Sequence, residues 1–495
     1  MNLADLVRSA AQGAPDRVAL VSGDERVTWS ELDARVEAVA RGLSKAGPEG
    51  GDRVAILLPN GIEFVVAWFG ALRAGLVGVP QTRSLTDAEV VGQLGDCGAT
   101  LLITDRARAA SLAAVEEPKG VRVPPALVVG GAEWTGWLAA PADPAGCEYP
   151  GTALAALIYT SGTSGRPRGV MLTHEALLAN VEQTSRMARV PVGTGDVVLL
   201  VLPLSHIYAL NGALSHVAAH AATAVLAERF DPVDSLDLIE REGVTHLVGA
   251  PPMYVAWSMM PEAARRLQRI RLAVSGSAPL PRDVYDRFRE ITGQPIYEGY
   301  GMTEAAPILT STLVADSPLP GSVGRALPGV DLRVVDDDGV QVTDGRAGEI
   351  VVRGRNLFAG YWPEGGGGPD SDGWFATGDL GRLDASSNVY LTGRKTGLII
   401  VSGFNVSPRE VEDVLIRHPD VDEVAVSGIA HPYTGQAVKA FVVPRPGSGL
   451  TVASVNAFAI ARLARFKSPT AVELVQQLPP ELRRPGKGRA TPSSP

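Results

Sequence analysis

The chain has 495 residues, of which 45% are hydrophobic and 20% are charged, a composition typical of a soluble globular protein with two to four domains. Its net charge of −9 and pI near 5.4 argue against nucleic acid as the main partner. Pro59, Glu63 and Arg73 interrupt the apolar runs, so we expect no transmembrane segment, and the N-terminal segment lacks the apolar stretch of a signal peptide. Cys97 and Cys147 have no metal-ligand spacing, and such isolated thiols favour a cytoplasmic location.

Apolar, strand-like runs alternate with amphipathic helical segments along the first two thirds of the chain. This alternation predicts parallel β-sheets that are covered by helices. The clearest strand-like runs lie at 156–162, 196–204, 245–252 and 271–278, and the helical ones at 175–188 and 234–242.

The pattern changes near Gly324. Shorter strand-like runs with turn signals between them predict a twisted antiparallel or barrel-like subdomain. After Arg394, about one hundred residues with their own helical and strand-like runs predict a small α/β domain. We therefore expect an N-terminal lobe at 1–393 and a C-terminal lobe at 394–495, with the active site in the cleft between them.

The segment YTSGTSGRPRG, residues 159–169, follows a strand-like run and combines hydroxyl side chains, glycines and a basic residue. Such a loop offers hydroxyl and N–H donors to a polyphosphate, and Arg168 adds positive charge. In isolation, the pattern is equally typical of an ordinary Gly/Ser loop. The candidate phosphate-binding residues are Thr160, Ser161, Gly162, Thr163, Ser164, Gly165 and Arg168.

Three further motifs contain candidate site residues. In GYGMTE, residues 299–304, the glycines permit close approach of a ligand, and Thr303 and Glu304 place a hydroxyl beside a carboxylate, which suits a phosphate oxygen and Mg²⁺. The TGD motif predicts a tight turn in which Asp379 accepts hydrogen bonds from two ribose hydroxyls, and Arg394 lies at the predicted junction of the lobes. Taken singly, these motifs are better explained as a helix N-terminus, a structural turn aspartate and a solvated arginine.

Taken together and in order, the four motifs resemble those of the adenylate-forming superfamily, which contains acyl-CoA synthetases, aryl-CoA ligases, peptide-synthetase adenylation domains and luciferases. The likeness extends from VTWSELDARVEAVARGL near the N-terminus to RFKSP and PGKGR near the C-terminus. It implies an α/β fold with a large N-terminal lobe of helix-covered β-sheets, a barrel-like subdomain, and a small mobile C-terminal α+β lobe.

The resemblance also implies a role for each motif. The 161–169 loop should bind the β- and γ-phosphates of ATP, Thr303 the α-phosphate and Glu304 the Mg²⁺, while Tyr300 should stack on adenine. His206 should lie beside the acyl carboxylate. The residues implied to bind the ribose are Asp379 and Arg394, and the further nucleotide, acyl and thiol-arm candidates are Gly276, Ser277, Ala278, Glu298, Gly299, Gly301, Met302 and Gly403.

The catalytic lysine of the superfamily lies in a Gly-Lys pair near the C-terminus, which here is Gly486 and Lys487. Only six of the 45 basic residues are lysines, so a lysine at this position favours catalysis over a solvated basic tail. The chain departs from the superfamily pattern at the lobe junction, where Thr396 and Gly397 replace a pair that usually contains an acidic residue. The junction is the expected hinge of the small lobe, so this departure concerns the rotation of that lobe.

We therefore expect an ATP-dependent ligase that converts a small-molecule carboxylic acid to acyl-AMP, releases pyrophosphate and transfers the acyl group to a thiol. Apolar predicted pocket segments favour a fatty acid, and coenzyme A is expected as acceptor ahead of the phosphopantetheine of an acyl carrier protein. The less favoured alternatives are an aryl-CoA ligase, a luciferase-like oxygenase, an amino-acid adenylation domain and a non-catalytic acyl- or nucleotide-binding homologue. The segment around His206 has no acid to pair an α-ammonium group, which argues against the amino-acid alternative.

Overall fold

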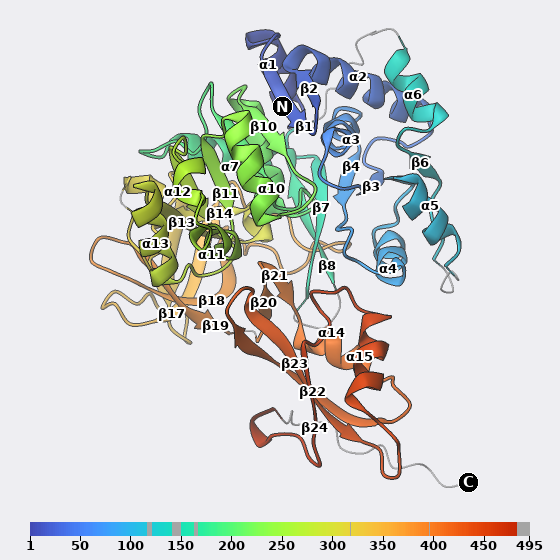
Figure 1. The fold of residues 1–495 in the computed structure, drawn as a ribbon, viewed down its shortest axis with the longest axis vertical. Helices are drawn as coiled ribbons and strands as arrows, with labels where there is room; N and C mark the ends of the chain where they lie inside the picture. Colours follow the sequence, from blue (N-terminus) through green and yellow to red (C-terminus); the bar gives the residue numbers. More distant parts are fainter. Residues whose placement is uncertain (116–120, 141–149, 163–166, 317, 396, 483–495) are drawn as a thin grey trace. The chain divides into compact units, whose positions relative to one another are not determined.

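The computed structural model describes residues 1–115, 121–140, 150–162, 167–316, 318–395 and 397–482. The chain divides into two compact units. The large unit consists of Met1–Thr160 and Pro167–Thr396, and the small unit consists of Gly397–Pro495 together with Ser161–Arg166. In Figure 1, the strands and helices that follow Gly397 are orange to red.

Among the described residues, the first sheet of the large unit has nine strands, and its central pairs are parallel, as the sequence predicts. Antiparallel partners flank the parallel core at both edges. In sheet order the strands are β15 (Arg325–Ala326), β14 (Ile308–Ser311), β13 (Ile296–Gly301), β12 (Leu272–Ser275), β11 (His246–Gly249), β9 (Val197–Leu200), β10 (Thr223–Leu226), β1 (Val18–Ser22) and β2 (Glu25–Thr28).

The second sheet of the large unit has six strands, of which only the β7–β8 pair is antiparallel. Strands β7 and β8 run into and out of the predicted phosphate loop. In sheet order the strands are β6 (Ala126–Val128), β5 (Leu101–Thr104), β3 (Arg53–Leu57), β4 (Val77–Pro80), β7 (Leu154–Thr160) and β8 (Arg168–Thr173).

Helices pack on these sheets, and their sequences explain where they begin. Thr28 and Thr86 each accept a hydrogen bond from the backbone N–H of a glutamate three residues later, which caps the helices that follow them. The third helix is apolar on nearly all sides, because it contacts strands of both sheets. The α-helices of the large unit are α1 (Asp5–Gly13), α2 (Trp29–Lys45), α3 (Ile62–Arg73), α4 (Asp87–Cys97), α5 (Arg106–Ala113), α6 (Ala132–Ala139), α7 (His174–Ser185), α8 (Ile207–Ala209), α9 (Ser215–Ala219), α10 (Pro232–Glu242), α11 (Pro251–Ser258), α12 (Ala263–Arg266) and α13 (Arg282–Thr292).

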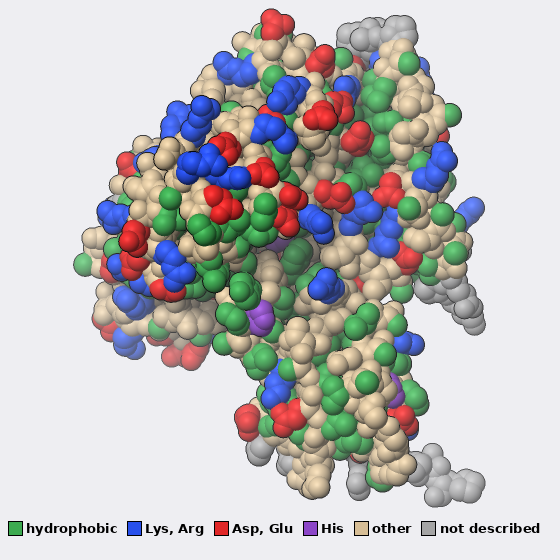
Figure 2. Space-filling model, viewed as in Figure 1, with side chains coloured by type: hydrophobic (Ala, Val, Ile, Leu, Met, Phe, Trp, Pro, Cys, Tyr) green, Lys and Arg blue, Asp and Glu red, His purple; other side chains and the backbone are tan. Residues whose placement is uncertain are grey.

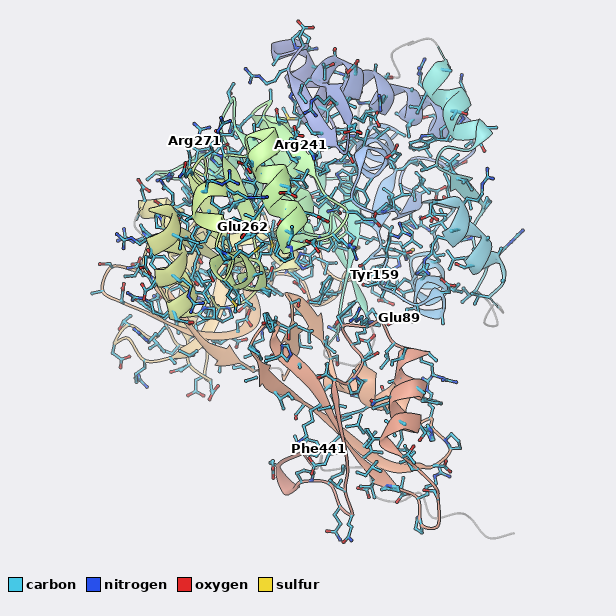
Figure 3. The ribbon with its side chains drawn as sticks, in the orientation of Figure 1. Glu89, Tyr159, Arg241, Glu262, Arg271 and Phe441 are labelled. Atoms are coloured by element: carbon cyan, nitrogen blue, oxygen red, sulfur yellow. The ribbon has the colours of Figure 1, made fainter. Side chains whose placement is uncertain are left out.

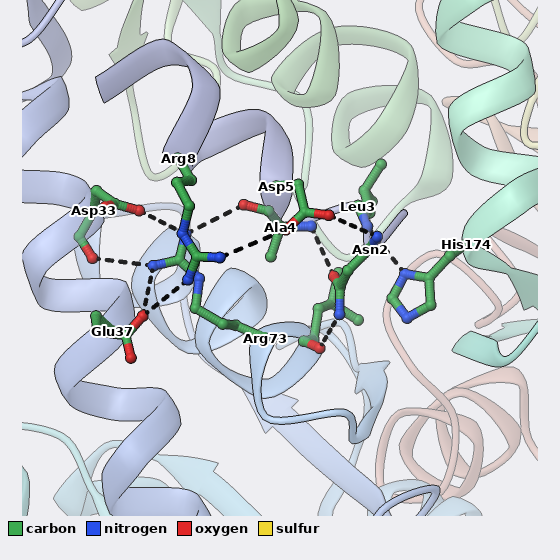
Figure 4. A network of polar contacts seen from close by, with 10 residues as sticks. Asn2, Leu3, Ala4, Asp5, Arg8, Asp33, Glu37, Arg73 and His174 are labelled. Carbon is green, nitrogen blue, oxygen red and sulfur yellow. Dashed lines mark hydrogen bonds and ion pairs between the residues drawn. The ribbon is translucent and has the colours of Figure 1, made fainter. Parts of the chain in front are cut away.

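Arg73, a buried arginine at the end of α3, links the N-terminal segment to α2 (Figure 4). Arg73 is 5% exposed and pairs with Asp33 at 2.6 Å and with Glu37 at 3.2 Å. It also donates to the carbonyl of Ala4, while the amide of Leu3 donates to His174 on α7. Because both carboxylates face a buried cation, this network offsets the cost of burying the charge.

An antiparallel sheet of four strands follows, as expected after Gly324: β16 (Val330–Val335), β17 (Gly348–Gly354), β18 (Phe375–Leu383) and β19 (Val389–Arg394). The prediction that Asp379 lies in a turn is wrong. Asp379 is inside β18, directly opposite Arg394 on β19. Gly378, the residue before Asp379, has a φ of +74°, so β18 is locally irregular at this point. The glycine that this irregularity favours gives the sequence the composition of a turn.

The small unit has its own sheet and apolar core. A buried ion pair of 2.6 Å joins Lys467 to Glu410 inside it. Figure 1 shows both helices of this unit on one side of its long β22–β23 hairpin. The elements are β20 (Ile399–Val401), β21 (Phe404–Val406), α14 (Pro408–Leu415), β22 (Val421–His431), β23 (Gly435–Pro444), α15 (Val452–Ile460) and β24 (Ala471–Leu474).

The surface carries both signs of charge. On the face drawn in Figure 2, Lys and Arg side chains interleave with Asp and Glu side chains. Within the described ranges, no helix combines the length and the apolar character needed to cross a membrane.

Candidate active site

The GYGMTE motif forms the end of β13 and the short 3₁₀ helix η2 (Thr303–Ala305). A Cβ atom on Gly301 would lie 2.1 Å from the carbonyl oxygen of Pro307, and one on Gly299 would lie 3.0 Å from that of Thr310. The glycine at 301 is therefore required by the close approach of the backbone that returns after the motif. That return places Thr303 and Glu304, both buried, directly beyond the end of β13.

Asparagine side chains hold this returning backbone in place. Asn211 donates to the carbonyl of Ala306 at 2.6 Å, and Asn180 donates to that of Ile308 at 2.8 Å. Asn356 donates to the carbonyl of Ala305 at 2.8 Å. These three residues could not be predicted from the sequence, because asparagines in helices and loops carry no signal of such distant contacts.

The predicted ribose carboxylate has two partners in the large unit. The hydroxyl of Tyr300 donates to one oxygen of Asp379 at 2.7 Å, and the Nε of Arg394 lies 2.5 Å from the other. Asp379 is 4% exposed, so the structure holds a buried carboxylate in one orientation. The Tyr300 hydroxyl is turned toward this carboxylate, and burial raises the pKa of Tyr300 well above its ordinary value.

The predicted metal carboxylate is also buried. Glu304 is 7% exposed, and the hydroxyl of Tyr361 donates to its Oε1 at 2.8 Å. Burial raises the pKa of Glu304, while the hydrogen bond from Tyr361 and the charge of Arg394 act to lower it. Tyr300, which contacts Asp379, lies at the end of β13, and Glu304 lies in η2 directly after it, so the expected metal and ribose groups share one neighbourhood.

The chemistry of this carboxylate fits Mg²⁺. Mg²⁺ prefers oxygen ligands and is commonly held by one or two carboxylates together with substrate phosphates. Within the described ranges, no group of three or more His, Cys, Asp or Glu side chains could form a protein-only metal site. A site at Glu304 would therefore depend on phosphate oxygens for most of its ligands.

The phosphate loop is described only at its two ends. Thr160 closes β7 and Arg168 opens β8, and these residues are paired across the two strands. Ser161 and Gly162 belong to the small unit, while Thr163, Ser164 and Gly165 lie outside the described residues. The Arg168 guanidinium lies 5.2 Å from the centre of the Tyr361 ring, a cation–π distance.

A tyrosine fixes the strand that enters this loop. The hydroxyl of Tyr159, labelled in Figure 3, donates to the carboxylate of Asp96 at the end of α4. The Trp362 indole N–H donates to the Asp96 backbone carbonyl at 3.0 Å, so both sides of the loop base are tied to one helix end. Cys97 is buried here and its pKa is raised to about 11 by burial, as expected for an unreactive thiol.

The segment after β12 carries Gly276, Ser277 and Ala278. A Cβ on Gly276 would lie 3.0 Å from the Tyr208 ring, so that ring packs directly on the glycine backbone. Ser277 has a φ of +71°, which is unusual for a residue with a side chain and indicates a constrained backbone. Glu298 has a carboxylate that accepts from the amides of Leu280 and Gly321, both at 3.3 Å, which ties this segment to its neighbours.

His206 caps the short helix α8. Its Nδ1 accepts a hydrogen bond from the amide of Tyr208 at 3.2 Å, which puts the proton of the neutral ring on Nε2. Burial lowers the pKa of His206 to about 4, so the ring is neutral near pH 7. The side chain can therefore act as a hydrogen-bond donor through Nε2 without carrying a charge.

Of the two candidate residues in the C-terminal lobe, Gly403 lies within the described residues and Lys487 does not. Gly403 occupies the two-residue turn between β20 and β21 with a φ of +87°, a conformation that favours glycine. Lys487 and Thr396 lie outside the described residues. The structure thus brings Tyr300, Thr303, Glu304, Asp379 and Arg394 together in the large unit, and it leaves the predicted lysine without a described position.

Comparison with known proteins gives matches over nearly the whole chain. Residues 7–362 match the family described as AMP-binding enzyme, and residues 410–487 match the AMP-binding enzyme C-terminal domain. A long-chain-fatty-acid–CoA ligase of Bacillus subtilis (strain 168) is 32% identical, with 96% of this chain and 91% of that protein covered. 4-Coumarate–CoA ligase 5 of Oryza sativa subsp. japonica is 34% identical (94% and 89% covered), as is a feruloyl-CoA synthase of an Amycolatopsis species (95% and 94%).

Solved structures show the same architecture. The amide bond synthetase McbA of Marinactinospora thermotolerans has a TM-score of 0.86 at 29% identity, with 97% of this chain and 96% of that chain covered. A double mutant of the o-succinylbenzoate CoA synthetase of Bacillus subtilis, bound to a product analogue, has a TM-score of 0.84 at 29% identity (96% and 95%). ATP-bound MatB of Rhodopseudomonas palustris has a TM-score of 0.73 at 33% identity (97% and 96%).

Proposed function

We propose, on the premise that this chain belongs to the AMP-binding enzymes and is an AMP-forming acid–CoA ligase, that its substrate is a fatty acid. ATP and coenzyme A are the co-substrates of such a ligase. The acid attacks the α-phosphate of ATP, pyrophosphate leaves, and coenzyme A then displaces AMP to give the thioester.

The observation that carries the nucleotide assignment is the buried carboxylate of Asp379 with its two partners. A ribose presents two neighbouring hydroxyls, and a carboxylate offers two acceptor oxygens to them. Arg394 at 2.5 Å pairs with one oxygen of this carboxylate, which is only 4% exposed, and Tyr300 at 2.7 Å donates to the other. A charged acceptor forms stronger hydrogen bonds with hydroxyls than a neutral one.

In the first half-reaction, negative charge grows on the α-phosphate and must be balanced. We assign Thr303 as a hydroxyl donor to that phosphate, Arg168 and the loop from Thr160 as the contact of the β- and γ-phosphates, and Lys487 as the cation that neutralises the transition state. Glu304 would hold Mg²⁺, which supplies Lewis-acid charge neutralisation on the phosphate oxygens when it is bound.

His206 is assigned to orient the acid. A neutral imidazole that donates from Nε2 can bind one carboxylate oxygen without forming an ion pair that would quench the nucleophile. In the second half-reaction, we place the thiol arm of coenzyme A beside Gly403, where the missing side chain leaves room for it. The small unit must turn between the two half-reactions in this scheme.

A fatty acid is favoured because the segments assigned to the acyl pocket are apolar. The region around Ile207–Leu214 is mostly buried, and its side chains include no cation to pair a second carboxylate. A longer acyl chain would gain about 0.8 kcal/mol for each methylene buried there.

An aromatic acid is the second candidate. The ring of Tyr208 is packed against Gly276, and a Cβ on Gly212 would lie 3.2 Å from the same ring. A flat phenol ring that packs closely against two glycines suits a planar substrate as well as a chain, and the coumarate and feruloyl ligases are relatives of this chain.

ATP–pyrophosphate exchange across a panel of acids tests the proposal. The panel should contain hexanoate, decanoate, palmitate, coumarate, ferulate and malonate at equal concentrations. We expect the fatty acids to support the fastest exchange, and fastest exchange with coumarate or ferulate would favour the aromatic candidate. Transfer from preformed acyl-adenylate to coenzyme A, compared with transfer to a holo carrier protein, then identifies the thiol. Acylation of the carrier orders of magnitude faster would contradict the assignment of coenzyme A.

A further inference from the structure

The segment at 358–362, which precedes a glycine-rich run at 365–368, connects β8, the strand that leaves the predicted phosphate loop, to Glu304, the predicted metal carboxylate. Its backbone pairs with β8: the amide of Ala359 donates to Met171, that of Met171 to Gly360, and that of Trp362 to Gly169, over 2.8–3.1 Å. On the other side, the amide of Phe358 donates to the carbonyl of Glu304 at 2.9 Å. Residues 358–362 therefore bridge the strand that leaves the phosphate loop and the residue expected to hold Mg²⁺.

Tyr361 makes the same connection through its side chain. Its hydroxyl donates to Glu304 Oε1 at 2.8 Å, and its ring centre lies 5.2 Å from the Arg168 guanidinium. Phe358 packs edge-on against the ring at a centroid distance of 5.0 Å. One aromatic side chain thus contacts the predicted metal carboxylate, the predicted phosphate-binding arginine and the apolar core.

The glycines after Tyr361 form a turn that packs against its ring. The amide of Tyr361 donates to the carbonyl of Gly366 at 3.0 Å, and the amide of Gly365 donates back to Tyr361 at 2.8 Å. A Cβ on Gly367, whose φ is +70°, would lie 3.1 Å from the Tyr361 ring. The glycine-rich turn folds over the tyrosine, and this limits the orientations open to its ring.

We propose that Tyr361 is a positioning residue for adenylate formation, which orients the Glu304 carboxylate for Mg²⁺ through its hydroxyl and supports Arg168 through its ring. The inference rests on the proposed function of this site. Its physical basis is that a carboxylate held by one hydroxyl loses less rotational freedom when a metal binds its other oxygen. The hydroxyl contributes to metal affinity, whereas the ring contributes to the phosphate contact.

Two substitutions separate these contributions. Tyr361→Phe removes the hydroxyl and keeps the ring, and Tyr361→Leu removes both. The chain offers a matched control in Tyr297, whose hydroxyl donates to Asp316 at 2.6 Å and whose ring centre lies 5.2 Å from the Arg189 guanidinium. Tyr297→Phe therefore deletes the same kind of contact at a place assigned no catalytic role.

The first measurement is binding of Mn²⁺, a spectroscopic substitute for Mg²⁺, followed by electron paramagnetic resonance in the presence of α,β-methylene-ATP. We expect Tyr361→Phe to raise the Kd for Mn²⁺ about tenfold and Tyr297→Phe to leave it unchanged. An unchanged Kd in Tyr361→Phe, an equal shift in the control, or failure of the wild-type protein to bind Mn²⁺ with the nucleotide would each overturn the inference.

The second measurement is pyrophosphate exchange. We expect Tyr361→Phe to raise the KM for Mg²⁺ with the KM for the acid unchanged, and Tyr361→Leu to raise the KM for ATP as well. A general loss of folding would instead lower the melting temperature and affect all substrates alike, and that result would also overturn a positioning role. If wild-type protein exchanges pyrophosphate with none of the acids, the proposed function fails, while the Mn²⁺ comparison still decides the role of Tyr361.

Discussion

Replacing Asp379 with asparagine tests the centre of the nucleotide site. The substitution keeps the size of the side chain and removes its charge. Tyr300 and Arg394, now at 2.7 Å and 2.5 Å from the carboxylate, would face an amide that accepts through only one oxygen. The ribose would lose a charged acceptor at the same time.

The magnitude follows from these contacts. A hydrogen bond to a charged group contributes about 1.5–3 kcal/mol, so loss of the charged acceptor for the ribose should reduce kcat/KM for ATP by about 10- to 100-fold. Arg394 is 24% exposed on its side chain, so water can solvate part of the guanidinium that loses its partner. We therefore expect a loss of stability below the roughly 3–5 kcal/mol that is typical when one partner of a fully buried pair is removed.

The assay is ATP–pyrophosphate exchange at varied ATP with a saturating acid, together with urea unfolding. Asp331→Asn is the matched control, because Asp331 and Arg353 form the same cross-strand pair at 2.8 Å in the same sheet, but with 61% and 47% of their side chains exposed. The control should change neither kinetics nor stability by more than about 1 kcal/mol. If Asp379→Asn lowers stability and leaves the KM and kcat/KM for ATP intact, Asp379 is a structural partner of Arg394 and the ribose assignment is refuted.

Three further expectations concern the lysine, the acyl pocket and acid stability. Lys487→Ala should slow adenylate formation a hundredfold or more, a loss of about 3–4 kcal/mol, and spare thioester formation from supplied acyl-adenylate; equal loss of both half-reactions would mean a structural lysine. Tyr208→Ala should shift the acid preference in pyrophosphate exchange toward longer acids, because it clears the space beside Gly276. An unaltered chain-length profile would mean that Tyr208 does not line the acyl pocket. Stability should fall as the pH is lowered from about 6.5 toward 4, because burial lowers the pKa of four histidines in the folded state. In this pH range only the unfolded chain takes up their protons. Each histidine then lowers the free energy of unfolding by about 1.4 kcal/mol per pH unit. Urea midpoints that are equal at pH 7 and pH 5 would contradict this last expectation. These histidines, with folded pKa values of about 4, 4, 3 and 4, are His174, His206, His216 and His246.

The sequence predicted the architecture well where local pattern and tertiary structure agree. Apolar runs separated by amphipathic segments became the parallel cores of two sheets, because a strand buried on both faces must be apolar throughout. The glycines of GYGMTE were predicted to permit close approach of a ligand, and the group that approaches Gly301 in the structure is the backbone of Pro307.

Long-range partners were beyond the reach of sequence pattern. The Thr-Gly-Asp tripeptide has the composition of a turn, and only the pairing of β18 with β19 shows that Asp379 continues a strand. Tyr361 precedes a glycine-rich run that predicts a loop, and its contact with Glu304 spans 57 residues. The three asparagines that fix the backbone after η2 come from separate elements, so no local motif contains them.

The two buried carboxylates of the site differ in a way that suits two different ligands. Asp379 already faces a cation, Arg394, and is therefore prepared to accept hydrogen bonds from uncharged hydroxyls without needing further charge. The carboxylate of Glu304 accepts a hydrogen bond from the hydroxyl of Tyr361 and forms no ion pair with any described residue, and burial raises its pKa. Ionised Glu304 therefore gains most from a partner that brings its own positive charge, as a divalent cation does. The same reasoning explains why the two acids should not be interchangeable: a metal at Asp379 would compete with Arg394, and a ribose at Glu304 would leave a buried charge uncompensated.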